Sequence, residues 1–352
     1  MNKKFYAKAA AVVAVLGLTV TATPAFAADA IAGKGSSFAN GALQYCLSHY
    51  DPASNDTVTY TSTGSGTGRS EFAKGNVDWA ATDGTYGSTE TKPSSYVTIP
   101  LLGGPVVFAY NKNSGLPANL KLDAATVSGI LKGTIAKWND KAIAKLNPGK
   151  TLPAKSILTF YRDASGTTEN VTNYLLQNVP AAGWTKSKDL GPQIKATNTT
   201  ATVKATSSVL ADKVQSTKYA FGYFDLSDAV SAKVAYASLK NANGDYVAPT
   251  AANGAKFLAG QTTVVDSSNA ATDGTLTIDF TKKIKGAYQL TIVTYGLAPK
   301  GGTTTKAAAV EGWFKYVVSS CIPTKGAGLG YVALPTKLKN AALAQIATIS
   351  DK

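Results

Sequence analysis

Residues 58–83 read VTYTSTGSGTGRSEFAKGNVDWAATD, and the fold class can be inferred from this stretch. A segment rich in Thr, Val and Tyr is followed by a glycine-rich turn, a helical pattern and an apolar run that ends at Asp83. The order predicts a strand, a turn, a helix and a second strand, which is the repeating unit of an α/β fold.

The same alternation continues along the chain. Residues 122–133 predict a helix capped by Asp123, residues 156–162 a strand followed by a helix that starts near Ser165, and residues 207–227 a helix and then a strand. We therefore predict mainly parallel sheets flanked by helices, with any ligand bound beyond the carboxyl ends of the strands.

Two further stretches are apolar. Residues 96–111 predict two apolar runs joined through Gly103 and Gly104, and residues 328–335 predict a last short strand.

The first 27 residues have the pattern of an export signal. A basic start precedes the apolar run 9–20, and an A-x-A pattern predicts cleavage after Ala27. No cysteine follows the cut, so we see no lipid-anchor signal, and no later run reaches the ~18 apolar residues that a membrane helix needs. We expect a soluble mature protein of 352 − 27 = 325 residues, with one large or two medium domains, located in a periplasm, at a cell surface or outside the cell.

The chain has only two cysteines, Cys46 and Cys321, near the opposite ends of the mature chain. In an exported protein such a pair is a disulfide candidate, and two buried free thiols are the alternative. A bond between them would place both ends of the chain in the same domain.

The net charge of +14 becomes +14 − 3 = +11 without the signal lysines. The lysines are scattered and form no dense basic block or aromatic-interleaved stripe, so we predict no nucleic-acid binding. A mildly cationic surface of this kind would help anions reach the protein.

Three segments place small hydroxyl residues and glycines at a predicted helix start, namely residues 33–47, 61–73 and 161–175. A helix start has unpaired N–H donors and a partial positive charge, which together can bind an anion. The alternative is that each segment only caps its helix, because Ser, Thr and Gly are the ordinary capping residues. The sequence does not show whether the three segments converge.

Arg162 and Asp83 make an anion site more specific. Arginine offers a planar fork of donors to an oxoanion, and the adjacent Asp163 can hold that fork in place, although an exposed ion pair is the alternative. An ionised Asp83 is only an acceptor, so it favours an anion that still carries a proton and discriminates phosphate from sulfate. A turn residue at a strand end is the other interpretation of Asp83.

Catalysis is not expected. The single histidine, His49, would have to serve any Ser-His-Asp triad, and there is no G-x-S-x-G elbow, metal-ligand spacing or Walker motif. A hydrolase that uses His49 is the remaining enzymatic alternative.

With these motifs the chain resembles the phosphate-binding proteins that serve bacterial phosphate ABC importers. The resemblance covers nearly the whole mature chain. It is carried by GKGSSF (33–38), GSGTGRSEFAKGNVDWAATD (64–83), LKGTIAKWNDKAIAKLNPG (131–149), RDASGTT (162–168) and GLGYVALP (328–335).

The resemblance implies an α/β fold of the periplasmic-binding-protein type, in which two lobes close on phosphate. Lobe I would comprise residues 28–108 and 288–352, and lobe II residues 109–287, with crossings near 103–110 and 284–292. The implied phosphate ligands are Ser37, Phe38, Ser65, Asp83, Arg162, Ser165, Gly166 and Thr167, with Asp163 bracing the arginine.

The third loop departs from the family pattern. The family usually has Arg-x-Asp-x-Ser-Gly, whereas Arg162 and Asp163 are adjacent here, and Tyr161 occupies the arginine position when counted from Ser165 without a gap. We favour Arg162 as the ligand contact. The Thr/Ala-rich stretch 196–208 is a second departure, because the family tends to have more glycine there.

The resemblance implies a monomeric phosphate receptor without cofactor or metal, which delivers phosphate to the permease subunits of an ABC importer. The alternative is a released surface or extracellular anion-binding protein of the same fold that is not coupled to transport.

Overall fold

The computed structural model describes residues 29–264 and 274–350. The expected export signal and its cleavage site lie outside the described residues. Within the described part of the chain, no helix combines the length and the apolar character needed to cross a bilayer.

The stretch 58–83 folds as its sequence predicts. Strand β2 (Thr57–Ser62), helix α2 (Ser65–Ala73) and strand β3 (Trp79–Thr82) follow one another, and β1 (Ala30–Gly35) lies between the two strands and parallel to both. Helix α2 lies directly on β1, since a Cβ added to Gly68 would be 2.5 Å from the Cα of Gly35. This close approach explains a glycine inside a helix, where it otherwise lowers stability.

One mixed sheet runs through the molecule in the order β2-β1-β3-β14-β4-β8-β6-β7, with β9 also paired to β4. The outer pairs are parallel, as expected for the α/β units, whereas β3, β14, β4 and β8 pair antiparallel. The remaining strands of this sheet are β4 (Val97–Tyr110), β6 (Leu158–Tyr161), β7 (Thr202–Val203), β8 (Ala220–Asp225), β9 (Ala235–Tyr236) and β14 (Thr291–Ala298).

Strand β4 is continuous, although two apolar runs joined through Gly103 and Gly104 were expected. All fourteen residues of β4 are buried. The glycines lie inside the strand because side chains pack against their Cα atoms: a Cβ on Gly103 would be 2.3 Å from Leu258 and one on Gly104 2.8 Å from Phe38.

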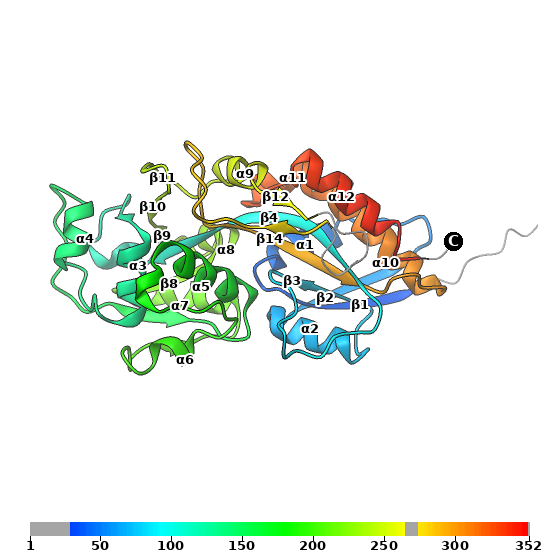
Figure 1. Cartoon of the computed structure of the whole chain (residues 1–352), viewed down its shortest axis with the longest axis horizontal. Helices are drawn as coiled ribbons and strands as arrows, with labels where there is room; N and C mark the ends of the chain where they lie inside the picture. Colours follow the sequence, from blue (N-terminus) through cyan, green and yellow to red (C-terminus); the bar gives the residue numbers. More distant parts are fainter. Residues whose placement is uncertain (1–28, 265–273, 351–352) are drawn as a thin grey trace, which may run out of the picture.

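Figure 1 shows two halves of the molecule, joined through β4 and β14. Strand β4 pairs with β14 as far as Pro105 and with β8 from Val106 onward, so its partner changes within the predicted first crossing. Strand β14 begins at Thr291, within the predicted second crossing. The lobe boundaries themselves remain a prediction. Below, "first half" means the part built around β1–β3 and α10–α12, and "second half" the part built around β6–β8 and α3–α8.

Helices cover the sheet in both halves. Asp123 caps its helix as predicted, through a reciprocal capping box with Thr126. The helices of the first half are α1 (Asn40–Leu47), α2, α10 (Thr305–Tyr316), the π-helix η3 (Val317–Cys321), α11 (Ile322–Lys325), the 3₁₀-helix η4 (Gly326–Leu329) and α12 (Thr336–Ile346). The other helices are η1 (Lys112–Ser114), α3 (Ala124–Lys132), α4 (Lys141–Leu146), α5 (Gly166–Asn178), η2 (Pro180–Ala182), α6 (Gly191–Ile194), α7 (Ser207–Ser216), α8 (Leu226–Ser231) and α9 (Ala251–Ala259).

Two small sheets complete the described structure. They contain β5 (Lys121–Leu122), β10 (Ser238–Lys240) and β11 (Tyr246–Val247), and β12 (Thr262–Thr263) and β13 (Leu276–Thr277). The last strand expected at 328–335 is reduced to a single bridge between Val332 and Gly103, because helical turns occupy the preceding residues.

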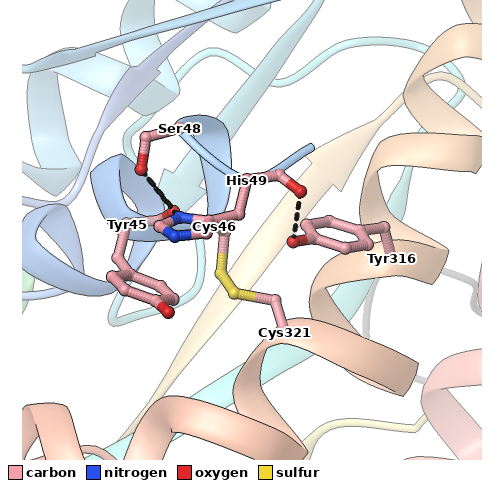
Figure 2. The surroundings of a disulfide bond; sticks show 6 residues. All are labelled: Tyr45, Cys46, Ser48, His49, Tyr316 and Cys321. Carbon is pink, nitrogen blue, oxygen red and sulfur yellow. Dashed lines mark hydrogen bonds between the residues drawn. A yellow bond between two sulfur atoms is a disulfide. The ribbon is translucent and has the colours of Figure 1, made fainter. Parts of the chain in front are cut away.

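The predicted disulfide is present (Figure 2). Cys46 near the end of α1 is bonded to Cys321 in η3, with their Cα atoms 5.8 Å apart and a sequence separation of 275. The bond therefore joins the two terminal regions of the chain in the first half.

Candidate anion-binding site

The three predicted helix starts converge between the halves. The amide of Gly66 in α2 donates to the carbonyl of Ala164, just before α5, at 3.0 Å. The side-chain amide of Asn170 in α5 donates to the Asp83 carbonyl at 2.5 Å, and the amide of Ser207 in α7 donates to Ser37 Oγ, before α1, at 3.1 Å. The third contact adds a fourth helix start, that of α7, which was predicted from the sequence as a helix but not as part of the site.

Asp83 lies at the centre of this convergence, with 3% of its surface exposed. Its carboxylate accepts hydrogen bonds from the hydroxyls of Ser36 at 2.6 Å, Thr294 at 2.8 Å and Ser65 at 3.2 Å. Burial raises the pKa of Asp83, and the three hydroxyls and the charge of Arg162 offset only part of that rise. The site thus contains a buried acceptor that is able to take a proton.

Ser36 and Thr294 were not predicted from the sequence. Ser36 is next to the predicted Ser37, and a pair of serines before a helix gives no sign of which one faces inward. Thr294 is 211 residues from Asp83, at a position where the β14 register shifts against β4. Such irregularities redirect a side chain, and only the paired strands reveal them.

Arg162, and not Tyr161, is directed to the site. A Cβ added to Gly64, at the N-cap of α2, would lie 3.5 Å from Arg162 Nη2, whereas the Tyr161 hydroxyl lies beside Gly191 at the start of α6. The Arg162 side chain is 1% exposed, and its Nε has no hydrogen-bond partner within residues 29–264 and 274–350. Burial lowers the pKa of Arg162, and the nearby Tyr223 and Asp83 partly counter this.

Asp163 has other partners than the arginine. Its carboxylate accepts from the amides of Leu190 at 2.7 Å and Gly191 at 2.9 Å. Among the described residues it makes no ion pair with Arg162, so the bracing role implied by the family pattern is not seen here. Asp163 lies in the bend that follows β6, and its carboxylate is directed to the start of α6.

The third loop is both a helix cap and part of the site. Ser165 accepts from the amide of Thr168 at 3.2 Å and so caps α5. Gly166 fits closely against the first half, since a Cβ there would be 2.4 Å from Ser65 Oγ. The hydroxyl of Thr167 is buried without a hydrogen-bond partner in the part of the chain that the structure describes.

Phe38 connects the site to the crossing strand. Its ring packs edge-on to Tyr331 at a centroid distance of 6.0 Å and reaches Gly104 in β4. Its carbonyl accepts from the Tyr331 hydroxyl at 2.8 Å. The two aromatic rings therefore fix the turn that presents Ser37.

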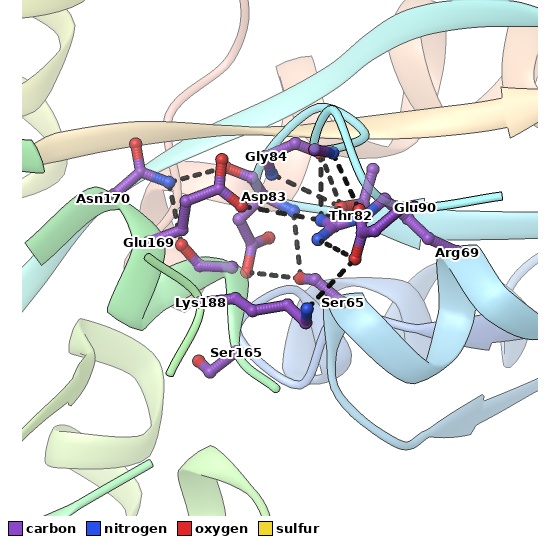
Figure 3. A network of polar contacts seen from close by, with 12 residues as sticks. Ser65, Arg69, Thr82, Asp83, Gly84, Glu90, Ser165, Glu169, Asn170 and Lys188 are labelled. Carbon is purple, nitrogen blue, oxygen red and sulfur yellow. Dashed lines mark hydrogen bonds and ion pairs between the residues drawn. The ribbon is translucent and has the colours of Figure 1, made fainter. Parts of the chain in front are cut away.

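A network of charged side chains links the halves beside Asp83 (Figure 3). The buried Arg69 donates to both carboxylate oxygens of Glu90, at 2.9 and 3.0 Å, and its Nη1 lies 3.6 Å from Glu169 Oε2 in α5. Lys188 Nζ, in the second half, lies 3.4 Å from Glu90 Oε1. Burial tends to raise the pKa of Glu90, but its hydrogen bonds with Arg69 lower it below the usual value. The network was not predicted.

His49 lies away from the site, just beyond the end of α1 (Figure 2). It is exposed and stacks on Tyr45, and its Nδ1 lies 2.9 Å from Ser48 Oγ and from the Tyr45 carbonyl. No carboxylate among the described residues hydrogen-bonds to it, so the geometry offers no support for the His49 hydrolase.

Comparison with known proteins agrees with this geometry. A model of the PBP superfamily domain matches residues 20–320. The phosphate-binding protein PstS of Xylella fastidiosa strain Temecula1 is 31% identical over 280 residues, covering 79% of this chain and 73% of the relative. PstS of Haemophilus influenzae is 32% identical over 234 residues, covering 66% of this chain and 69% of the relative.

Solved structures show the same fold. PfluDING, a high-affinity periplasmic phosphate-binding protein bound with phosphate, has a TM-score of 0.71 at 19% identity, covering 92% of this chain and 99% of its own. A phosphate-binding protein from Stenotrophomonas maltophilia has a TM-score of 0.70 at 20% identity, covering 90% and 93% of the two chains. The chain therefore belongs to the PBP superfamily and, within it, to the family of PstS phosphate-binding proteins.

Proposed function

We propose that the mature protein is an exported receptor that binds inorganic phosphate between its two lobes and delivers it to a membrane ABC importer. The observation that carries the proposal is a buried acceptor, Asp83, beside buried donors that lack partners in the described structure, Arg162 Nε and Thr167 Oγ1. Buried polar groups are almost always satisfied, so orphaned donors indicate the position of a ligand.

The arrangement suits an oxoanion that carries a proton. The start of α5, Arg162, the hydroxyls of Ser37 and Thr167 and the backbone amide of Ser65 would donate to phosphate oxygens, and Asp83 would accept the remaining phosphate proton. Each hydrogen bond to a charged group contributes about 1.5–3 kcal/mol, so several aimed donors offset the removal of water from the anion. Sulfate is fully ionised at neutral pH and would face the Asp83 carboxylate without a proton to share.

Titration calorimetry of the mature protein with phosphate and with sulfate tests this function. We expect phosphate to bind at micromolar or lower concentration and sulfate to bind far more weakly. Absence of phosphate binding at micromolar concentration would rule the receptor function out.

The Asp83→Asn variant tests the basis of the selectivity. It removes the charge that repels sulfate, so we expect the ratio of phosphate to sulfate affinity to fall at least about tenfold, or about 1.4 kcal/mol. Selectivity equal to that of the wild type would show that Asp83 does not accept the ligand proton.

Delivery to an importer requires closure on phosphate and a permease partner. Phosphate would shift the equilibrium between an open and a closed arrangement of the lobes, with the protein acting as a monomer. We expect the mature protein to remain associated with cells and to restore phosphate uptake in a strain that lacks it. If it is found only in the medium and does not restore uptake, the released anion-binding protein is the better interpretation.

A further inference from the structure

Ser207 occupies a position in the site that its helix does not explain. It is the first residue of the ten-residue helix α7, and its side chain is fully buried. The helix is capped by the preceding residue, since Thr206 Oγ1 accepts from the amide of Val209 at 3.3 Å. The Ser207 hydroxyl is therefore not needed for capping, and it has no well-aligned hydrogen bond in the described structure.

The surroundings of Ser207 point toward the anion. Its amide donates to the hydroxyl of Ser37, a predicted phosphate ligand, at 3.1 Å. Arg162 Nε and Thr167 Oγ1, two other groups of the site, are equally buried and unpartnered within residues 29–264 and 274–350. One ligand that accepts hydrogen bonds from all three would satisfy them together, whereas three separate orphaned groups would be costly.

Asp225 lies behind Ser207. It caps α8, where its Oδ1 accepts from the Asp228 amide at 2.8 Å and lies 3.4 Å from the Tyr331 hydroxyl. Its Oδ2 is buried and has no partner in the described part of the chain. Burial and the neighbouring Asp228 carboxyl raise the pKa of Asp225 well above its ordinary value, and the nearby Ser207 hydroxyl lowers it only in part.

The protonation of Asp225 decides what Ser207 can do. An ionised carboxylate would accept the hydroxyl proton of Ser207 and leave only a lone pair for the anion. A protonated Asp225 would instead donate to Ser207 Oγ and leave the serine proton for the anion, as long as the Asp228 carboxyl, which also lies near this hydroxyl, does not accept that proton.

We propose that Ser207 donates its hydroxyl to the bound phosphate as a fourth loop of the site, and that Asp225 positions that hydroxyl, a role that requires Asp225 to carry its proton. The inference rests on the proposed phosphate-receptor function and extends it, because neither residue belongs to the ligand set implied by the family pattern.

The first test compares Ser207→Ala with Ser208→Ala by phosphate calorimetry on the mature protein. Ser208 is the exposed neighbour in the same helix, so its variant controls for a change in α7. Loss of one hydrogen bond to a charged group corresponds to a roughly ten- to hundredfold weaker affinity for Ser207→Ala. We expect Ser208→Ala to bind like the wild type. A Ser207→Ala variant within twofold of the wild type would overturn the inference while leaving the receptor function intact.

The second test compares Asp225→Asn with Asp225→Ala. Asparagine caps a helix as well as aspartate does, and its amide donates as the protonated acid would. We expect Asp225→Asn to stay within about threefold of the wild type and Asp225→Ala to lose affinity as Ser207→Ala does.

A purely structural role, the cap of α8, would lower the melting temperature of Asp225→Ala without phosphate and leave its phosphate affinity close to that of Asp225→Asn. An Asp225→Asn variant that binds phosphate more than about tenfold tighter would show that Asp225 is ionised beside the anion, which contradicts the proposal. A wild-type protein that does not bind phosphate at all would overturn the receptor function and this inference together.

Discussion

At the scale of single residues, the site depends on a carboxyl group placed where its charge is disfavoured. Asp83 is buried, and three hydroxyl donors and Arg162 compensate its charge only partly, so its pKa stays raised. A proton shared with a ligand would relieve this condition, so in the proposed function the same residue would serve both binding and discrimination.

The raised pKa of Asp83 predicts a stability change with pH. Between about pH 4, its ordinary pKa, and the raised value, the folded protein holds a proton that the unfolded chain releases. Stability therefore falls as pH rises through this window, by about 1.4 kcal/mol for each pH unit that the window spans. In phosphate-free buffer we expect Asp83→Asn to lack this loss, so that it gains stability relative to the wild type as pH rises.

Denaturant unfolding at several pH values measures this effect. Asp225, whose pKa is also raised, is present in both proteins and cancels in the difference. A difference between the two proteins that does not change with pH would mean that the folded-state pKa of Asp83 is ordinary.

Ala164 predicts a second residue-scale effect. Its φ of 51° lies in the left-handed region, which costs an alanine about 1–2 kcal/mol. Ala164→Gly removes this strain, but it loosens the unfolded chain and gives up part of a half-buried methyl group. The net expectation is a gain of about 0.5 kcal/mol in the free energy of unfolding.

The control for this gain is Ala344→Gly in α12, an exposed helical position where the same substitution should lose about 1 kcal/mol. Denaturant unfolding compares the two variants. A loss of stability in Ala164→Gly would show that the contacts of this alanine outweigh its backbone strain.

At the scale of elements, the start of α5 is both capped by its own residues and packed closely against the first half. Ser165 caps the helix, and Gly166 lets the helix approach the first half so closely that a Cβ would be 2.4 Å from Ser65 Oγ and 2.9 Å from the Asp83 amide. Glycine is thus required at position 166 because the first half packs against it, and not because of its own backbone conformation.

Gly166→Ala should consequently impair closure without harming the fold. When the halves separate, the added methyl group has room, so we expect an unchanged melting temperature without phosphate. In the closed state it should lower phosphate affinity roughly ten- to hundredfold, as expected for about 1–3 kcal/mol of overpacking.

Calorimetry and thermal unfolding with and without phosphate distinguish these effects. Gly328→Ala is a suitable control, because a Cβ there meets no atom within 4 Å. Wild-type phosphate affinity in Gly166→Ala would mean that α5 docks less closely in solution than in this structure.

At the scale of the whole molecule, ion pairs join the two halves and would stabilise the proposed closed arrangement. Arg69 and Glu90 belong to the first half, and Glu169 and Lys188 to the second, so the pairs Arg69–Glu169 and Lys188–Glu90 exist only when the halves meet. The side chain of Glu169 is only 9% exposed, which limits screening by solvent.

Glu169→Gln should accelerate phosphate release. It leaves the buried Arg69 with one carboxylate fewer in the closed state, so we expect the dissociation rate to rise about three- to tenfold. The association rate should change little, as is usual for contacts made after the encounter.

Stopped-flow kinetics measures both rates. Lys186→Gln is the matched control, since Lys186 pairs with Glu169 at 3.0 Å inside the second half and, among the described residues, makes no ion pair with the first half. Equal phosphate dissociation rates for Glu169→Gln and the wild type would show that the Arg69–Glu169 ion pair does not stabilise the closed arrangement.

The α/β alternation, the helix starts at Ser65 and Ser165, and the presence of Asp83 and Arg162 at the candidate site could all be predicted from the amino-acid sequence alone. These features are local, because a cap, a turn or a strand end is encoded by residues a few positions apart. The cysteine pair indicated which distant segments meet, since in an exported chain two cysteines have few alternatives.

The surroundings of those residues became known only from the tertiary structure. Thr294 reaches Asp83 from 211 positions away, and Ser207 reaches Ser37 from 170. The folded chain also shows that Arg162 and not Tyr161 faces the site, and that Asp163 binds the start of α6. Such contacts arise from strand order, register shifts and the docking of the halves, which no short stretch of the chain encodes. The loops of the site could therefore be predicted from the sequence, whereas its complete hydrogen-bond network could not.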